Sequence, residues 1–327
     1  MQSFRTVLPS VKSPFHISHA DRLMFIGSCF SENIGRRFQQ ARFTATINPF
    51  GQQYNPASIA QSIELLLRGK EFTASDLFFY NEQYHSFAHH GSFSRSTVEE
   101  TLELINAKFW EAATQIKTAS VLYLTPGTSH VFRWKSSGEI VSNCHKLPGH
   151  QFEQQIMTPQ DIYSSWQKAI AALREVNPAL KIVFTVSPVR YLANGAYQNS
   201  VSKAHLFAAI FQLHQELPNT CYFPAYELMM DDLRDYRFYA EDMIHPNAIA
   251  IDYVWQYLGQ YFFTQQTTEI IKTVDDLTKA MNHRPRNAAS EAHRKFLKDC
   301  LHKMKDLSLA SGLNFDKEIA ILQDNLG

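Results

Sequence analysis

The sequence lacks several features that would mark a disulfide-rich, metal-binding or membrane protein. Its four cysteines are scattered without C-x-x-C spacing, which favours reduced thiols over two disulfides. The histidine-rich residues 85–90 have neither zinc-finger nor H-E-x-x-H spacing, so we expect no metal and no other cofactor. No apolar run approaches the roughly 20 residues that span a bilayer, and the first residues do not resemble a signal peptide. We therefore expect a cytoplasmic protein without a membrane span.

An excess of charge of either sign is also missing. Lys and Arg together number 31, and so do Asp and Glu, so the chain has no general attraction for nucleic acid or anionic lipid. Its 45% hydrophobic and 19% charged residues are typical of a folded globular protein. A chain of 327 residues can form one large α/β domain with additions, or two modest domains. Its ligands must be recognised by local groups.

Short apolar runs alternate with segments of helical periodicity. The predicted strands are residues 23–28, 43–47, 120–125, 181–186 and 220–223. Helix start signals stand at Asn55-Pro56, at the capping box of residues 96–99 and at Thr158-Pro159. This alternation predicts an α/β fold with a mainly parallel five-stranded sheet covered on both faces. Ligand sites in such folds form where the strands end.

Three segments depart from the alternation. Residues 71–95 are rich in Phe, Tyr and His and predict a hairpin or flap, and residues 131–142 predict a hairpin that turns at residues 135–138. From about residue 266 the chain becomes more polar and helical. We therefore expect an α/β domain of residues 1–265 and a helical extension of residues 266–327. The extension could pack on its own domain or on a second subunit.

Residues 27–30, Gly-Ser-Cys-Phe, end the first predicted strand and open a helix. At a helix N-terminus, free N–H groups and the helix dipole favour a Cys29 thiolate. The same N–H groups could stabilise an oxyanion. Ser28 is the rival nucleophile, although a side chain at the last strand position more often points into the sheet packing. The structural alternative is that Cys29 is a small buried apolar residue.

Asp242 precedes His245 by three residues, far downstream. At this spacing the carboxylate can bind one imidazole nitrogen and leave the other free to act on a nucleophile. Pro246 favours an extended conformation for His245, just before an apolar helix, which would mount the ring rigidly. The alternative is a pair that only caps that helix. Together with Cys29 or Ser28, the pair predicts an acyl-transfer site.

Two further polar residues stand near the predicted strand and hairpin ends. We expect Asn143 to be a hydrogen-bond donor near the site. Its neighbours Cys144 and His145 would face opposite ways on an extended strand, so they cannot act together on one atom. Arg190 follows a predicted strand and could bind a substrate carboxylate or phosphate. The alternative for Arg190 is a salt bridge to the acidic residues within 231–235.

These residues, in this order, resemble the GSCFA family, a branch of the SGNH/GDSL hydrolase superfamily, over about residues 20–265. The resemblance is carried by residues 27–30, 48–51, 143–146, 187–190, 231–237 and 242–246. It implies a flavodoxin-like three-layer α/β/α fold in a bacterial protein. It also implies the activity of an esterase, a lipase or a carbohydrate O-acyl hydrolase.

The resemblance further implies roles for single residues. Cys29 takes the position of the nucleophilic serine, Ser28 that of the preceding aspartate, and Asp242 and His245 match without adjustment. Gly51 corresponds to the glycine that donates an N–H to the oxyanion. The asparagine donor expected after the third strand is missing, because residues 127–130 read Gly-Thr-Ser-His. Ser129, His130 or Asn143 would have to replace it.

Two hypotheses follow. The first is a hydrolase or acyltransferase that acts on an ester or thioester of a small molecule or glycan through Cys29 or Ser28. The second is an inactive SGNH-fold protein that binds a glycan or an acylated cell-envelope precursor through Arg190 and the aromatic residues of 71–95. The reactivity of the Cys29 thiol separates the two hypotheses. The sequence leaves open the acyl acceptor and any self-association into homo-oligomers.

Overall fold

A five-stranded parallel sheet forms the centre of the protein. We describe it from a computed structural model, for residues 5–9, 13–283, 287, 290–324 and 326. Its strands are β1 (Arg22–Gly27), β2 (Thr44–Ile47), β5 (Val121–Thr125), β9 (Lys181–Phe184) and β10 (Thr220–Tyr222). Their order in space, β2-β1-β5-β9-β10, is the 2-1-3-4-5 order of flavodoxin-like folds. The five predicted strands and the predicted fold class are confirmed.

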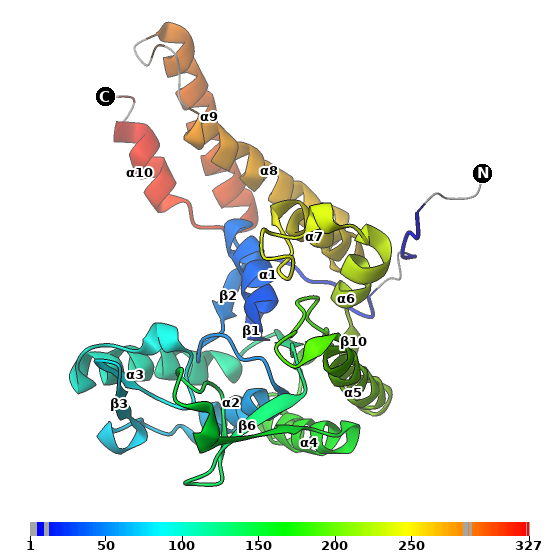
Figure 1. Cartoon of the computed structure of the whole chain (residues 1–327). Coiled ribbons are helices and arrows are strands. Elements are labelled where there is room, and N and C mark those ends of the chain that lie inside the picture. Colours follow the sequence, from blue (N-terminus) through cyan, green and yellow to red (C-terminus); the bar gives the residue numbers. More distant parts are fainter. Residues whose placement is uncertain (1–4, 10–12, 284–286, 288–289, 325, 327) are drawn as a thin grey trace.

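Different helices cover the two faces of this sheet (Figure 1). Because side chains alternate along a strand, Met24 and Ile26 face one layer and Leu23 and Phe25 face the other. The first layer consists of α2 (Pro56–Arg68), α3 (Val98–Ile116), α4 (Pro159–Val176) and α5 (Gly195–Glu216). The second consists of α1 (Cys29–Gln40) and α7 (Ala248–Phe262). The result is a three-layer α/β/α arrangement buried on both sides.

The helix start signals are nearly all where the sequence placed them. Asn55 accepts a hydrogen bond from the Ser58 N–H at the start of α2, and Thr158 forms a capping box at the start of α4. The capping residue of α3 is Thr97, one residue later than predicted. Ser96 lies outside that helix, and its hydroxyl donates to the Glu100 carboxylate instead.

Two small antiparallel sheets accompany the main one. Strands β3 (Phe78–Tyr80) and β4 (Gln83–His85) form a hairpin within residues 71–95, as predicted. Strands β6 (His130–Trp134) and β7 (Ile140–Val141) form the second predicted hairpin. A third strand, β8 (Phe152–Ile156), pairs with the other edge of β6 and was not predicted. The remaining short elements are α6 (Ala225–Glu227), a π-helical turn over Leu228–Leu233 and four 3₁₀ turns among the described residues.

The C-terminal helices have a core of their own. They are α8 (Gln265–Asn282), α9 (Glu291–Ser311) and α10 (Asp316–Asp324), and they lie beyond α1 and α7 in Figure 1. Val274, Leu297 and Met304 belong to their separate apolar cluster. Arg42 pairs with Glu318 and lies over the Phe315 ring, which ties the extension to the α/β domain. A division near residue 265 stays a prediction. No helix in the described ranges is long and apolar enough to cross a membrane.

Candidate active site

The turn after β1 places Ser28 and Cys29 at the carboxyl edge of the sheet. A Cβ atom on Gly27 would lie 2.3 Å from the Thr125 carbonyl oxygen, so only glycine allows β1 and β5 to approach this closely. The Ser28 N–H donates to the same carbonyl at 3.0 Å. Ser28 then caps α1 and is 1% exposed, whereas Cys29, the first residue of α1, is half-buried.

The loop before α7 holds Asp242 and His245 in a tight hydrogen-bonded unit. His245 Nδ1 donates to Asp242 Oδ2 at 2.6 Å. The other carboxylate oxygen accepts the N–H groups of Ile244 and His245, each at 2.9 Å. These bonds, the backbone ones first, lower the pKa of Asp242 to about 2, so the carboxylate is ionised at neutral pH. The pair leaves Nε2 of His245 free to accept a proton.

A cavity of about 800 Å³ collects groups from several strand ends. Of the residues singled out in the sequence, it is lined by Ser28, His130, Asn143, Arg190 and His245. Two polar atoms of these lining residues, Ser28 Oγ and His130 Nε2, are buried without a hydrogen-bond partner among the described residues. Burial also lowers the pKa of His130. Buried polar atoms without partners beside a cavity are typical of a ligand site.

Not all of these lining residues are free to contact a ligand. The Asn143 side-chain oxygen accepts a hydrogen bond from the His145 N–H at 2.8 Å. Only the NH₂ group of Asn143 is then available to a ligand. Arg190 is exposed and donates to the Met230 sulfur at 3.2 Å. It forms no salt bridge with any carboxylate of the described chain, so the expected alternative pairing with residues 231–235 is not observed. Ser129 is fully buried outside the lining.

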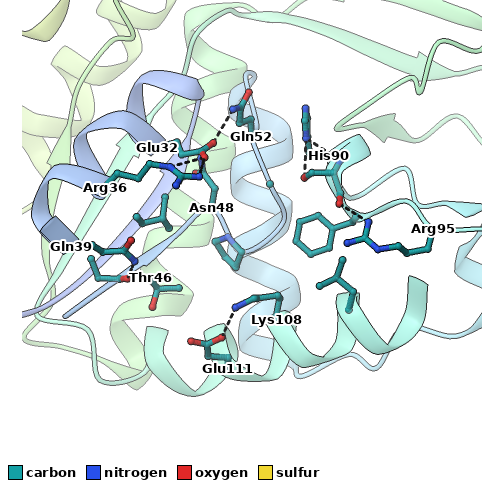
Figure 2. A pocket seen from close by; sticks show the side chains of 17 residues that line it. Glu32, Arg36, Gln39, Thr46, Asn48, Gln52, His90, Arg95, Lys108 and Glu111 are labelled. Atoms are coloured by element: carbon teal, nitrogen blue, oxygen red, sulfur yellow. Dashed lines mark hydrogen bonds and ion pairs between the residues drawn. The ribbon is translucent and has the colours of Figure 1, made fainter. Parts of the chain in front are cut away.

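Gly51 lies in a different environment from the one its expected role requires. Its N–H donates to the Asn48 carbonyl at 2.7 Å within a tight turn, where Gly51 has a φ of 77°. It lines a second cavity of about 580 Å³, shown in Figure 2, rather than the cavity of Ser28 and His245. In this conformation the Gly51 N–H is already used, and the structure does not bring it to an oxyanion.

The second cavity is polar, and two ion pairs form part of its lining. Arg36 pairs with Glu32 at 2.5 Å and Lys108 pairs with Glu111 at 3.2 Å. Figure 2 marks both pairs with dashed lines. Gln52 donates to the second Glu32 oxygen at 2.9 Å. The Tyr54 hydroxyl donates to Gln52 Oε1 at 2.6 Å, and Tyr54 lines the first cavity. A hydrogen-bonded chain from Tyr54 to Glu32 therefore connects the linings of the two cavities.

The thiol of Cys29 is protonated at rest. Burial raises its pKa, and this outweighs the lowering by the N–H groups of Phe30 and Cys29 and by the charge of Lys203. The thiolate expected from the helix N-terminus is therefore not the resting form, because loss of hydration dominates. Cys29 is not among the residues that line the 800 Å³ cavity, although its neighbour Ser28 is.

Cys144 and His145 point in different directions, but His145 lies in a turn with a φ of 49° and not on the extended strand expected from the sequence. Cys144 lines the 800 Å³ cavity, and burial raises the pKa of its thiol to about 11. The His145 ring instead lies against the Ser86 carbonyl, with its Nε2 at 2.9 Å. The two side chains therefore do not form a second reactive pair.

Sequence reasoning missed Lys203, a fully buried lysine that contacts the backbone of the cavity lining. Its ammonium donates to the carbonyls of Gly127, Ser187 and Val189 at 2.6, 2.6 and 2.9 Å. It thereby joins the loops that follow β5 and β9, both of which line the cavity. Burial lowers the pKa of Lys203 to about 7, while three carbonyl acceptors match the three N–H donors of the charged form.

A signal for Lys203 was present in the sequence. Lys203 stands at helical spacing with Leu206, Ile210 and Leu213, all of which are buried on α5. A lysine in the middle of an apolar stripe must either reach solvent or find buried acceptors. The sequence alone could therefore have marked this residue as unusual, although not its partners.

The comparison with protein families shows to which family the chain belongs. Residues 22–258 match the GSCFA family, and residues 274–326 match the GSCFA domain protein, C-terminal domain. The chain belongs to the GSCFA family. Among curated proteins, none matches the chain.

Solved structures resemble this GSCFA protein only distantly. A carbohydrate esterase family 3 from Talaromyces cellulolyticus has a TM-score of 0.38 and 10% identity, over 78% of this chain and 99% of that one. An acetyl esterase mutant S10A with acetate ion has a TM-score of 0.37 and 11% identity, over 79% and 99%. A Clostridium thermocellum family 3 carbohydrate esterase has a TM-score of 0.35 and 10% identity, over 78% and 98%. Similarity at this level carries no information on substrate or on residue roles.

Proposed function

We propose that this GSCFA protein is a hydrolase or acyltransferase that acts on an ester or thioester. Cys29 is the nucleophile, His245 the general base and Asp242 the group that orients the base. One observation carries the proposal: an ionised Asp242 holds His245 Nδ1 at 2.6 Å, and His245 lines the same cavity as the Ser28 that precedes the thiol. The substrate, a cytoplasmic location and self-association stay predictions.

The reaction begins with proton transfer, because a thiol with a raised pKa needs a base. His245 Nε2 takes the Cys29 proton while Sγ bonds to the acyl carbon, and Asp242 stabilises the imidazolium. The carbonyl electron pair moves to the oxygen, which the N–H groups of Cys29 and Phe30 stabilise. Collapse of this intermediate breaks the bond to the alcohol or thiol, which leaves with the proton from His245. Water or a second alcohol then releases the acyl group from Cys29 in the same way.

Ser28 remains the rival nucleophile. Its Oγ lines the cavity and lacks a partner within the described chain, which suits a reacting group. Its side chain is nearly inaccessible, however, while Cys29 is half-buried and can be approached. Accessibility favours Cys29 as the group that forms the acyl-enzyme.

The test is the intact mass of the protein after brief exposure to p-nitrophenyl acetate, with the adduct located by peptide mapping. We expect one acetyl group on Cys29, absent from Cys29→Ala and from His245→Ala. Ser28→Ala and Cys144→Ala are matched controls that should keep the adduct. An acetyl group on Ser28 would move the nucleophile to that residue, and a folded protein without any adduct would contradict catalysis.

A second candidate is a binding protein that uses the cavity without turnover. The raised pKa of Cys29 and the occupied Gly51 N–H favour it, because both weaken an acyl-transfer site. This candidate predicts reversible binding of an acylated ligand, no covalent adduct and unchanged affinity in Cys29→Ala. The mass experiment therefore separates the two functions.

A further inference from the structure

The small β7-β6-β8 sheet gives the 800 Å³ cavity an apolar wall. Phe132 on β6 pairs directly with Val141 on β7, so the two side chains share one face of this sheet. Phe152 on β8 pairs with Trp134, two residues after Phe132, and therefore lies on the same face. Phe132, Val141 and Phe152 all line the cavity. Three strands thus contribute one continuous apolar surface.

The apolar lining continues beyond the small sheet. Leu147 follows β7, Leu192 and Ala193 precede α5, and Ile244 stands next to His245 in the lining. Of the polar groups in the lining, Ser28 and Ser187 follow strands of the main sheet, whereas His130 begins β6 of the small sheet. Reacting groups and apolar wall therefore come from different parts of the fold, as a bound molecule with a polar and an apolar end requires.

We propose that the protein selects esters or thioesters with a medium-to-long unbranched acyl chain, which lies along Phe132, Val141 and Phe152. This inference rests on the proposed function, because it places the acyl carbonyl at the strand ends beside Ser28 and His245. An acetyl group would leave most of the apolar wall in contact with water. A chain such as octanoyl would cover that wall and gain free energy with each buried methylene.

The same wall is poorly suited to a sugar ring. Sugars need several hydrogen-bond partners, and the small-sheet side offers His130, which has one nitrogen without a partner in the described chain, together with Ser142 and Asn143. The Ser142 hydroxyl already accepts from Gln53 at 3.0 Å, and the Asn143 oxygen accepts from His145. The acyl chain is therefore the part of the substrate that fits this wall, whatever alcohol or thiol carries it.

The rate test uses p-nitrophenyl esters from acetate to laurate with the full-length protein. We expect kcat/KM to rise about two- to fourfold for each added methylene until the wall is covered, and then to level off. Ala193→Trp, on an exposed part of the lining, should shift the optimum to shorter esters. Ala196→Trp, exposed on α5 outside the lining, is the matched control.

A binding test keeps the inference separate from catalysis. Octanamide and acetamide, titrated calorimetrically, should differ at least tenfold in affinity for the wild-type protein, and Ala193→Trp should remove most of that difference. Octanamide binding without turnover of any ester would support the chain site and contradict the proposed reaction. Rates that stay flat or fall with chain length, equal affinities for the two amides, or a chain preference unchanged by Ala193→Trp would overturn the inference.

Discussion

Two cavities share the loop of residues 48–55, and their linings differ in kind. Asn48, Gly51 and Gln52 line the 580 Å³ cavity, whereas Tyr54 and Asn55 line the 800 Å³ cavity. In the smaller cavity Glu32 and Arg36 pair with each other, as Figure 2 shows, and Asn48 Nδ2 is buried without a partner among the described residues. In the larger one, Ser28 Oγ has no partner within the described residues, and an apolar wall stands opposite.

The two cavities differ in composition: polar and charged groups dominate the smaller one, whereas the larger one combines an apolar wall with two polar atoms that lack a partner within the described chain. Exposed ion pairs contribute little free energy and are satisfied by solvent and by one another. Unpartnered buried polar atoms carry a desolvation cost that a bound molecule can relieve. The size of a cavity alone would not distinguish the two, since both are large enough for a small ligand.

The largest expected effect is the difference in kcat/KM between two single variants, each of which removes a histidine that lines one of the cavities. His245→Ala should lower kcat/KM by about 10²–10⁴-fold, because proton transfer to the thiol and the leaving group is lost. His90→Ala, in the smaller cavity, should leave kcat/KM within about twofold. Ester hydrolysis by both variants, with folding checked by circular dichroism, measures the contrast. Equal losses would show that the two cavities act as one site.

The next contrast uses one lysine beside each cavity. Lys203→Met leaves three carbonyls without their donor and should lower the free energy of unfolding by about 1–3 kcal/mol. Lys108→Met loses only an exposed pair with Glu111 and should cost less than about 1 kcal/mol. Urea unfolding of both variants measures the difference, and similar values would contradict the role assigned to Lys203.

Lys203 also has an electrostatic role that packing alone would not produce. Its charge lowers the pKa of Cys29, and because burial lowers the pKa of Lys203 itself to about 7, its loss should slow Cys29 alkylation by iodoacetamide mainly below that pH. Lys203→Arg keeps the charge and should restore much of the profile. If the pH profile of Cys29 alkylation is unchanged in Lys203→Met, the role of Lys203 is structural only.

Local signals in the sequence predicted most of the fold, and contacts distant in sequence account for the rest. Apolar runs and the Asn55 and Thr158 caps act within a few residues, so strands and helix starts were predicted nearly in place. Strand β8 was missed because its middle residues, Glu-Gln-Gln, are exposed and show no alternation. That omission matters, because β8 supplies Phe152 to the apolar wall.

In the candidate site, too, local features could be predicted from the sequence, whereas contacts between distant residues could not. The Asp242–His245 hydrogen bond spans three residues and could be predicted from spacing. The contact of Lys203 with Gly127 spans 76 residues and could not. The pKa of Cys29 depends on how deeply the folded chain buries the thiol, which no local rule provides.

The smallest effect concerns His89, which is buried and stacks on Phe50 with 4.9 Å between the ring centroids. Burial lowers the pKa of His89 to about 3, from an ordinary 6.5. The unfolded chain therefore binds more protons below pH 6.5, and stability falls as the pH decreases from there toward 3. Because one pKa unit corresponds to about 1.4 kcal/mol, His89 should account for about 1 kcal/mol of the loss between pH 7.5 and 5.5.

Urea unfolding of the wild type and of His89→Phe at pH 7.5 and 5.5 measures this contribution. The variant should lose about 1 kcal/mol less than the wild type over that interval. His90→Phe is the matched control: burial lowers the pKa of this half-buried ring too, but a neighbouring Glu32 charge opposes the shift. Its pH dependence should stay closer to that of the wild type. Equal changes in the two variants would mean that His89 and His90 contribute equally to the pH dependence of stability. Burial of His89 would then not explain the loss of stability at acid pH.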